Sequence, residues 1–158
     1  MLKLDRILVP VNFSAESDLA LDWAIRLARE EKNASILLCN IFPRIISPVG
    51  PEVMGFNYTD YFDKEKKALE QKLKKLKKRI PKGISSTCVV MQGNAARQIE
   101  SLCRQKKISL VVMTTHARRG LSHLVQGSIA EKTVRLAPCP VLVLHLHGAE
   151  APVAKSGM

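Results

Sequence analysis

The residues best suited to ligand chemistry lie in a short polar segment between a buried apolar run and a helix. The run ending at Met113 leads into residues 114–121, which carry His116, Arg118 and Arg119. The N-terminus of the helix that follows attracts anionic oxygens, because its first backbone N–H groups and its dipole point toward them. The two arginines add cations that pair well with phosphate. The pattern therefore favours an anionic ligand, with a phosphate group as the natural candidate.

The sequence gives no support for a catalytic or metal centre. No nucleophile–base pair accompanies His116, which fits a phosphate contact and a solvated loop position equally well. His145 and His147 alternate at the end of the last apolar run and would face the same side. Two imidazoles without a third ligand nearby favour a solvated strand end over a metal site. We therefore predict a non-enzymatic protein, with at most slow ATP hydrolysis and no metal-ligating residues.

The four cysteines are spread along the chain and include no C-x-x-C pair. Two of them, Cys39 and Cys88, fall within apolar strand-like runs, and the others are Cys103 and Cys139. This distribution favours small buried hydrophobes in a reducing compartment over disulfides or a zinc site.

Strands alternate with helices along the chain, and this alternation predicts the fold. Short β-branched runs are typical of strands buried on both faces. Their alternation with helices implies right-handed crossovers and a parallel sheet covered on both faces. In such open sheets, ligands bind beyond the carboxyl ends of the strands. The predicted strands cover residues 6–11, 34–42, 86–91, 108–113 and 141–144, and the predicted helices cover 15–30, 60–80, 95–106 and 122–137.

Helical spacing also predicts which side chains of the first and last helices face the sheet. In the first helix, with Ser14 as its N-cap, we expect an apolar stripe with alanines beside it. The stripe consists of Leu19, Trp23 and Leu27, with Ala20, Ala24 and Ala28 beside them. In the last helix, the expected inward residues are Leu124, Val125, Ile129 and Leu136.

The net charge of +11 comes largely from one helix. Residues 60–80 hold nine lysines and arginines against four acidic residues, an excess of five. Such a helix could contact nucleic acid or anionic lipid. Aromatic residues form only 4% of the chain, which argues against stacking platforms for nucleic-acid bases. The charge pattern therefore favours a lysine-rich helix face that is solvated, and it argues against nucleic acid as a partner.

Length and composition predict one soluble domain over residues 1–147, followed by a disordered tail over 148–158. Hydrophobic residues make up 46% of the 158 residues and charged residues 25%, an ordinary globular balance. No apolar run approaches the roughly 20 residues of a membrane span. The N-terminus shows neither the apolar stretch nor the cleavage site of a signal peptide. We therefore expect a cytoplasmic protein without a membrane partner.

Several motifs, in order and at matching spacing, resemble the universal stress protein family. They lie at residues 113–121, 127–132 and 137–143, and at residues 7–14 at the start of the chain, with Gly93 before the third helix. The resemblance covers roughly residues 5–144. It implies a Rossmann-like fold of the adenine nucleotide α hydrolase type, with five parallel strands in the order 3-2-1-4-5. It also implies a stress-response homodimer joined through the last strand.

The resemblance further implies how a nucleotide would bind, and this sequence departs from that pattern at three positions. The family's nucleotide-binding branch uses a glycine, two residues, a second glycine, nine residues, and then Gly-Ser or Gly-Thr. Gly127 and Ser128 match the last part, but Thr114 and Ala117 stand where the first two glycines occur. Asn12 replaces the usual aspartate after the first strand. If the backbone at Ala117 needs a positive φ, alanine carries a penalty that glycine does not.

Two interpretations therefore remain. In the first, the protein binds ATP or AMP, with Mg²⁺ accompanying ATP, at the carboxyl ends of the first and fourth strands. In the second, it belongs to the branch that does not bind nucleotide and acts as a dimeric interaction or regulatory protein. The nucleotide-binding residues of the first interpretation are Pro10, Val11, Asn12, Ile41, Met113, Thr114, His116, Ala117, Arg118, Gly127, Ser128 and Ile129.

The last apolar run is the expected dimer interface. Val141, Leu142, Val143 and Leu144 would form an exposed apolar sheet edge in a monomer. Such an edge is an aggregation liability that pairing removes. A two-fold antiparallel pairing of this strand with its copy closes the assembly.

Overall fold

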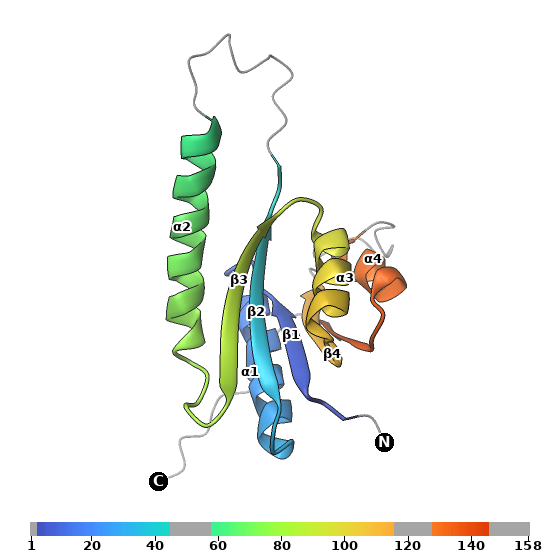
Figure 1. Cartoon of the computed structure of the whole chain (residues 1–158). Helices are drawn as coiled ribbons and strands as arrows, with labels where there is room; N and C mark the ends of the chain where they lie inside the picture. Colours follow the sequence, from blue (N-terminus) through green and yellow to red (C-terminus); the bar gives the residue numbers. More distant parts are fainter. Residues whose placement is uncertain (1–2, 45–57, 116–127, 146–158) are drawn as a thin grey trace.

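A parallel five-stranded sheet forms the centre of the protein, as seen in a computed structural model that describes residues 3–44, 58–115 and 128–145 (Figure 1). The strand order is β3-β2-β1-β4-β5, which confirms the predicted topology. The strands are β1 (Arg6–Pro10), β2 (Ser35–Phe42), β3 (Ser85–Gln92), β4 (Leu110–Thr115) and β5 (Val141–His145).

Helices cover both faces of the sheet because side chains of the buried strands alternate between two apolar clusters. One cluster joins β-strand residues such as Ile7 and Val9 to the helices α1 (Ala15–Glu30) and α2 (Tyr58–Lys77). The other joins Leu8 to α3 (Ala95–Lys106) and α4 (Ile129–Leu136). Neighbouring residues of β1 therefore supply both cores.

The apolar stripe predicted for α1 is correct for its three alanines and wrong for Trp23. Leu21 and Ile25 are buried against the sheet together with three alanines, whereas Trp23 is 39% exposed. Leu19 and Leu27 are only half-buried. Because α1 carries apolar residues around much of its circumference, the periodicity alone did not select a face. The small alanines let the helix approach the sheet closely, and this contact fixes the rotation.

The predicted start of α4 at residue 122 is also wrong. Ser128 has an extended backbone, and its side-chain oxygen accepts a hydrogen bond from the Glu131 N–H at 3.0 Å, so the helix begins at Ile129. Ile129, expected to point inward, is 54% exposed. Leu124 and Val125 lie outside the described residues. Ser128 therefore caps this helix instead of lying inside it, and Gly127 lies outside the described residues.

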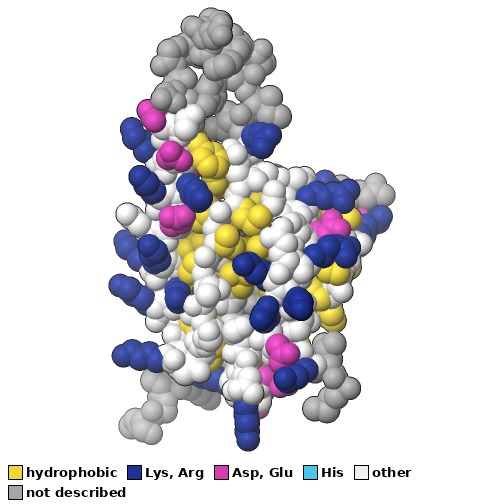
Figure 2. Space-filling view, in the orientation of Figure 1, with side chains coloured by type: hydrophobic (Ala, Val, Ile, Leu, Met, Phe, Trp, Pro, Cys, Tyr) yellow, Lys and Arg dark blue, Asp and Glu magenta, His cyan; other side chains and the backbone are white. Residues whose placement is uncertain are grey.

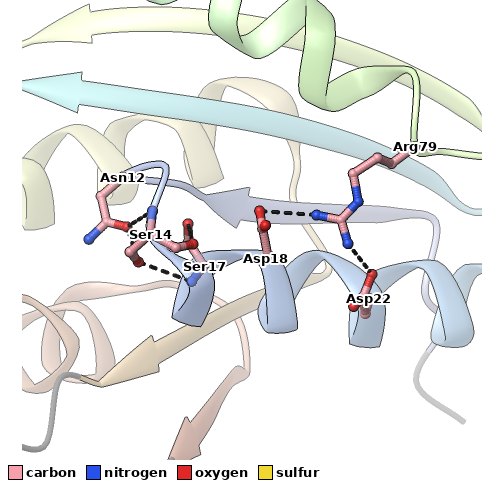
Figure 3. Close-up of polar contacts among 6 residues, drawn as sticks. All are labelled: Asn12, Ser14, Ser17, Asp18, Asp22 and Arg79. Atoms are coloured by element: carbon pink, nitrogen blue, oxygen red, sulfur yellow. Dashed lines mark hydrogen bonds and ion pairs between the residues drawn. The ribbon is translucent and has the colours of Figure 1, made fainter. Parts of the chain in front are cut away.

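The lysine-rich helix α2 presents its cations to solvent while its apolar stripe packs on the sheet. Leu69 and Leu73 are buried, and exposed lysines follow the outer side of the helix (Figure 2). Arg79, two residues after the end of this helix, forms ion pairs with Asp18 at 3.0 Å and Asp22 at 2.8 Å on α1 (Figure 3). One guanidinium therefore ties the end of α2 to α1.

We expect R79A to lower the free energy of unfolding by about 0.5–1 kcal/mol, because both ion pairs are partly exposed and screened by water. The matched control is K78A, which removes a neighbouring exposed cation for which no ion pair is seen. Urea titration monitored by circular dichroism measures both variants. Equal stability of R79A and K78A would show that the ion pairs contribute nothing.

Candidate functional site

A cavity of about 310 Å³ opens at the carboxyl edge of the sheet, where the strand order reverses between β1 and β4. This position is where open α/β sheets bind their ligands. None of the described residues that line the cavity is charged. They are Pro10, Val11, Asn12, Ser17, Cys39, Ile41, Ala95, Ile99, Met113, Thr114, Thr115, Ser128, Ile129 and Ala130.

Three helices begin at the cavity, and each contributes lining residues from its first turns. These residues are Ser17 of α1, Ala95 of α3, and the segment 128–130 at the start of α4. Each helix start is capped by a side-chain oxygen, so its geometry is well defined. Because the N-terminal end of each helix dipole carries partial positive charge, the cavity attracts anionic groups without a charged side chain among its described lining.

The turn between β1 and α1 is held by a chain of short polar contacts (Figure 3). Asn12 Oδ1 accepts hydrogen bonds from the Ser14 backbone N–H at 3.1 Å and from the Ser14 hydroxyl at 2.5 Å. Ser14 Oγ in turn accepts from the Ser17 N–H at 3.2 Å. Asn12 therefore uses its carbonyl oxygen to fix the helix cap, which is the role of an Asx turn. An aspartate would supply the same acceptor, so the exchange to Asn12 preserves the turn.

The end of β2 supports the cavity from the other side. Val11 donates its N–H to the Cys39 carbonyl at 2.8 Å, and the Asn40 amide donates to the Val11 carbonyl at 2.9 Å. Asn40 points to the sheet face opposite Ile41, because successive side chains of a strand alternate. Ile41 and Cys39 line the cavity, whereas Asn40 lies on the opposite sheet face and fixes the turn after β1 through its bond to Val11. Burial raises the pKa of the Cys39 thiol, which makes it an inert wall residue.

Ser128 is a polar residue of the cavity lining at the start of α4, and its side chain and backbone both form hydrogen bonds. Its hydroxyl oxygen accepts from Glu131 N–H, and its carbonyl accepts from Lys132 N–H at 3.1 Å. The N–H groups of Ile129 and Ala130 precede the first bond within the helix, so they are available to a ligand by the ordinary geometry of a helix start. A phosphate oxygen placed near Ser128 would meet these two N–H groups and the hydroxyl.

Eight of the predicted nucleotide-binding residues line this one cavity, coming from β1, β2, β4 and the start of α4. They are Pro10, Val11, Asn12, Ile41, Met113, Thr114, Ser128 and Ile129. The other four predicted residues, His116, Ala117, Arg118 and Gly127, lie outside the described residues, as does Arg119. Their role stays a prediction.

Thr115, which also lines the cavity, belongs to the segment 114–121 where ligand chemistry was predicted. Sequence reasoning missed the other five lining residues: Ser17, Cys39, Ala95, Ile99 and Ala130. Two of these had a readable signal. Cys39 shares the strand face of Ile41 because it lies two positions earlier, and Ile99 lies one helical turn after Ala95. The small residues at the helix starts gave no sequence signal of a site, because they contribute to the cavity by leaving space for a ligand and not by a recognisable chemical group.

Strand β5 lies at one edge of the sheet, and its apolar residues Val141 to Leu144 are half-buried. Val111 of β4 donates its N–H to the Pro140 carbonyl at 3.0 Å. Hydrogen-bonding direction alternates along a strand, so Leu142 and Leu144 bond toward β4 while Val141 and Val143 direct their backbone groups outward. The outward groups are a template for a further strand.

Among the described residues, no group of three histidine, cysteine or acidic side chains is arranged to hold a metal ion. None of the described helices has the length and apolar character that would let it cross a membrane.

The comparisons with known proteins match both the sequence and the fold. Universal stress protein YxiE of Bacillus subtilis is 26% identical over 146 residues, covering 89% of this chain and 98% of YxiE. Universal stress protein MJ0531 of Methanocaldococcus jannaschii is 36% identical over 76 residues, covering 48% of this chain and 45% of MJ0531. The chain thus aligns with less than half of the length of MJ0531 but with nearly all of YxiE.

Two solved structures share the fold at low identity. The structure of MJ0577 has a TM-score of 0.74 and 17% identity, covering 92% of this chain and 99% of that chain. A universal stress protein family protein of Arabidopsis thaliana with AMP bound has a TM-score of 0.59 and 18% identity, covering 94% and 96%. The sequence model of the universal stress protein family matches residues 3–145. Because that match spans nearly the whole chain, this protein belongs to the universal stress protein family.

Proposed function

We propose that this protein is a stress-response protein that binds an adenine nucleotide, ATP or AMP, in the cavity at the carboxyl ends of β1 and β4. The observation that carries the proposal is the convergence of three capped helix N-termini on a cavity at the reversal of strand order. That arrangement suits a ligand with an apolar body and an anionic end. The related Arabidopsis structure, which has AMP bound, supports an adenine nucleotide over other phosphates.

The lining divides into two parts that fit the two ends of a nucleotide. Val11, Ile41 and Met113 form an apolar wall suited to the adenine ring. Ser128 and the first N–H groups of α4 suit the phosphates. Mg²⁺ would enter with ATP on the phosphate oxygens, because it prefers oxygen ligands and keeps part of its water shell. The described lining offers hydroxyls and no carboxylate, which fits binding without efficient hydrolysis.

Calorimetric titration of the full chain with ATP, ADP and AMP tests this proposal. We expect saturable heat with at least one of the three nucleotides, and a rise in melting temperature at saturating ligand. Neither heat nor a thermal shift at millimolar nucleotide would overturn nucleotide binding.

The double variant T114G/A117G restores the two glycines and separates the competing interpretation from the proposal. If the wild type is an interaction protein that does not bind nucleotide, only the variant would show binding. If the wild type binds nucleotide with Thr114 and Ala117 in place of the two glycines, both proteins bind nucleotide, and the variant binds it more tightly. Circular dichroism of the variant provides the control that the added glycines leave the fold intact.

We also propose that two copies pair through β5. The half-buried apolar residues of this edge strand and its outward backbone groups support a two-fold antiparallel pairing. A dimer would extend the sheet across both copies and remove the exposed edge.

The variant V143P tests the pairing, because proline removes an outward N–H while the β4–β5 bonds remain. We expect V143P to be a monomer by size-exclusion chromatography with light scattering. The matched control V143T keeps the N–H and the β-branched shape, and it should remain a dimer. A dimeric V143P, or a monomeric wild type, would contradict pairing through this strand.

A further inference from the structure

Two cysteines that are 36 positions apart in the sequence lie in van der Waals contact beside the α3–α4 packing. The sulfur atoms of Cys103 on α3 and Cys139 on the connector from α4 to β5 are 3.8 Å apart. Both thiols are reduced in the structure. An S–S bond is about 2.05 Å long, so the two sulfurs, now 3.8 Å apart, would have to approach each other by about 1.75 Å to form one.

The two cysteines differ in their burial. The Cys103 side chain is buried, and its carbonyl accepts the Ile108 N–H at 3.0 Å, which anchors the end of α3. Cys139 is half-buried and lies between Pro138 and Pro140 outside any helix or strand. The approach of the two sulfurs would therefore come mainly from Cys139, and an oxidant would reach Cys139 first.

Burial disfavours the thiolate form of both cysteines. Burial and the neighbouring Cys139 sulfur raise the pKa of Cys103 to about 12. Burial also raises the pKa of Cys139, and the contact with the Cys103 sulfur opposes that rise. The thiolate is the reactive form of cysteine. Cys139 is the more exposed thiol of the pair and is therefore the better placed to react with an oxidant.

We propose that Cys139 and Cys103 form an oxidant-sensing pair that converts to an intramolecular disulfide on reaction with a hydroperoxide. The Cys139 thiolate attacks the outer peroxide oxygen, the O–O bond breaks, and the alkoxide or hydroxide that leaves takes up a proton. Cys139 is then a sulfenic acid. The Cys103 sulfur attacks the Cys139 sulfur, the S–O bond breaks, and the departing hydroxide takes the Cys103 proton to leave as water.

The disulfide would join α3 covalently to the segment that leads into β5. Ile99 on α3 and Ala130 on α4 line the candidate nucleotide cavity, and both belong to the same apolar cluster as Cys103. Oxidation would therefore fix the two helices that frame one side of that cavity. The proposal concerns the thiol pair itself and stands whether or not a nucleotide binds.

Treatment of the reduced full chain with hydrogen peroxide, followed by alkylation and mass spectrometry, tests the proposal. We expect the number of alkylated cysteines to fall from four to two, with a linked peptide that joins Cys103 to Cys139. The control C88S removes a half-buried thiol on the other face of the sheet, and it should still form the linked peptide.

Two further variants distinguish the steps. C103S should stop at the sulfenic acid of Cys139, which a cyclic 1,3-diketone traps, whereas C139S should give neither trapped acid nor linked peptide. The wild-type peptide map remains decisive if a variant folds poorly, which circular dichroism reports. A Cys39–Cys103 link, a link between two chains, or unchanged alkylation of both thiols would each overturn the proposal.

Discussion

Replacing Ser128 with aspartate should weaken ATP binding by about tenfold or more, which corresponds to about 1.4 kcal/mol or more, without loss of stability. Aspartate caps a helix as well as serine does, so α4 should keep its first turn. The new carboxylate would occupy the place where Ser128 Oγ accepts the Glu131 N–H, at the end of the cavity that we assign to the phosphates. Repulsion between this carboxylate and the phosphates opposes binding.

The matched control is S128N, which has nearly the shape of S128D and no charge. Asparagine is an equally good cap, so S128N should bind ATP within a few-fold of the wild type. The ratio of affinities between the two variants should be greatest for ATP, smaller for AMP, and close to one for adenosine. Calorimetric titration measures the series. A ratio that does not depend on the number of phosphates would contradict our assignment of the phosphate end.

Replacing Leu8 with alanine should lower the free energy of unfolding by about 3 kcal/mol, within the usual range for a fully buried leucine. Leu8 is 0% exposed on the central strand β1, where it pairs with Leu37 of β2 and Val111 of β4. The truncation removes apolar contacts and leaves a space that the paired strands on both sides cannot easily close. Denaturant titration at neutral pH measures the loss.

The control for this substitution is V134A, which removes apolar atoms from a residue on α4 that is 54% exposed. Its cost should stay within about 0.5 kcal/mol, as for most surface substitutions. A loss for L8A no larger than that of V134A would show that β1 is not the packed centre of the sheet.

The sequence was sufficient for the order of elements and for the family, because the relevant signals are local. A β-branched run such as residues 7–9 favours a strand wherever it lies, and residues 113–121 and 137–143 keep their spacing in the linear chain. The start of α4 was also readable. Ser128 followed by Glu131 is the pattern of a helix N-terminus, but the apolar Leu124 and Val125 extended the helical period and concealed it.

Only the tertiary structure decided which residues meet. The spacing within α1 placed its alanines against the sheet, but it did not show that Leu21 and Ile25 share this buried face while Trp23 does not. The cavity joins residues from Pro10 to Ala130, and the space within it is set by how three helices approach one sheet edge.

The segment after Met113, where ligand chemistry was predicted, forms only one part of the cavity lining. Its described part contributes Thr114 and Thr115, while α1 and α3 supply walls that the sequence did not indicate. The contact between Cys103 and Cys139 has the same origin. Local periodicity comes from neighbours along the chain and can be read there, whereas contacts between distant segments come from packing, which only the folded chain determines.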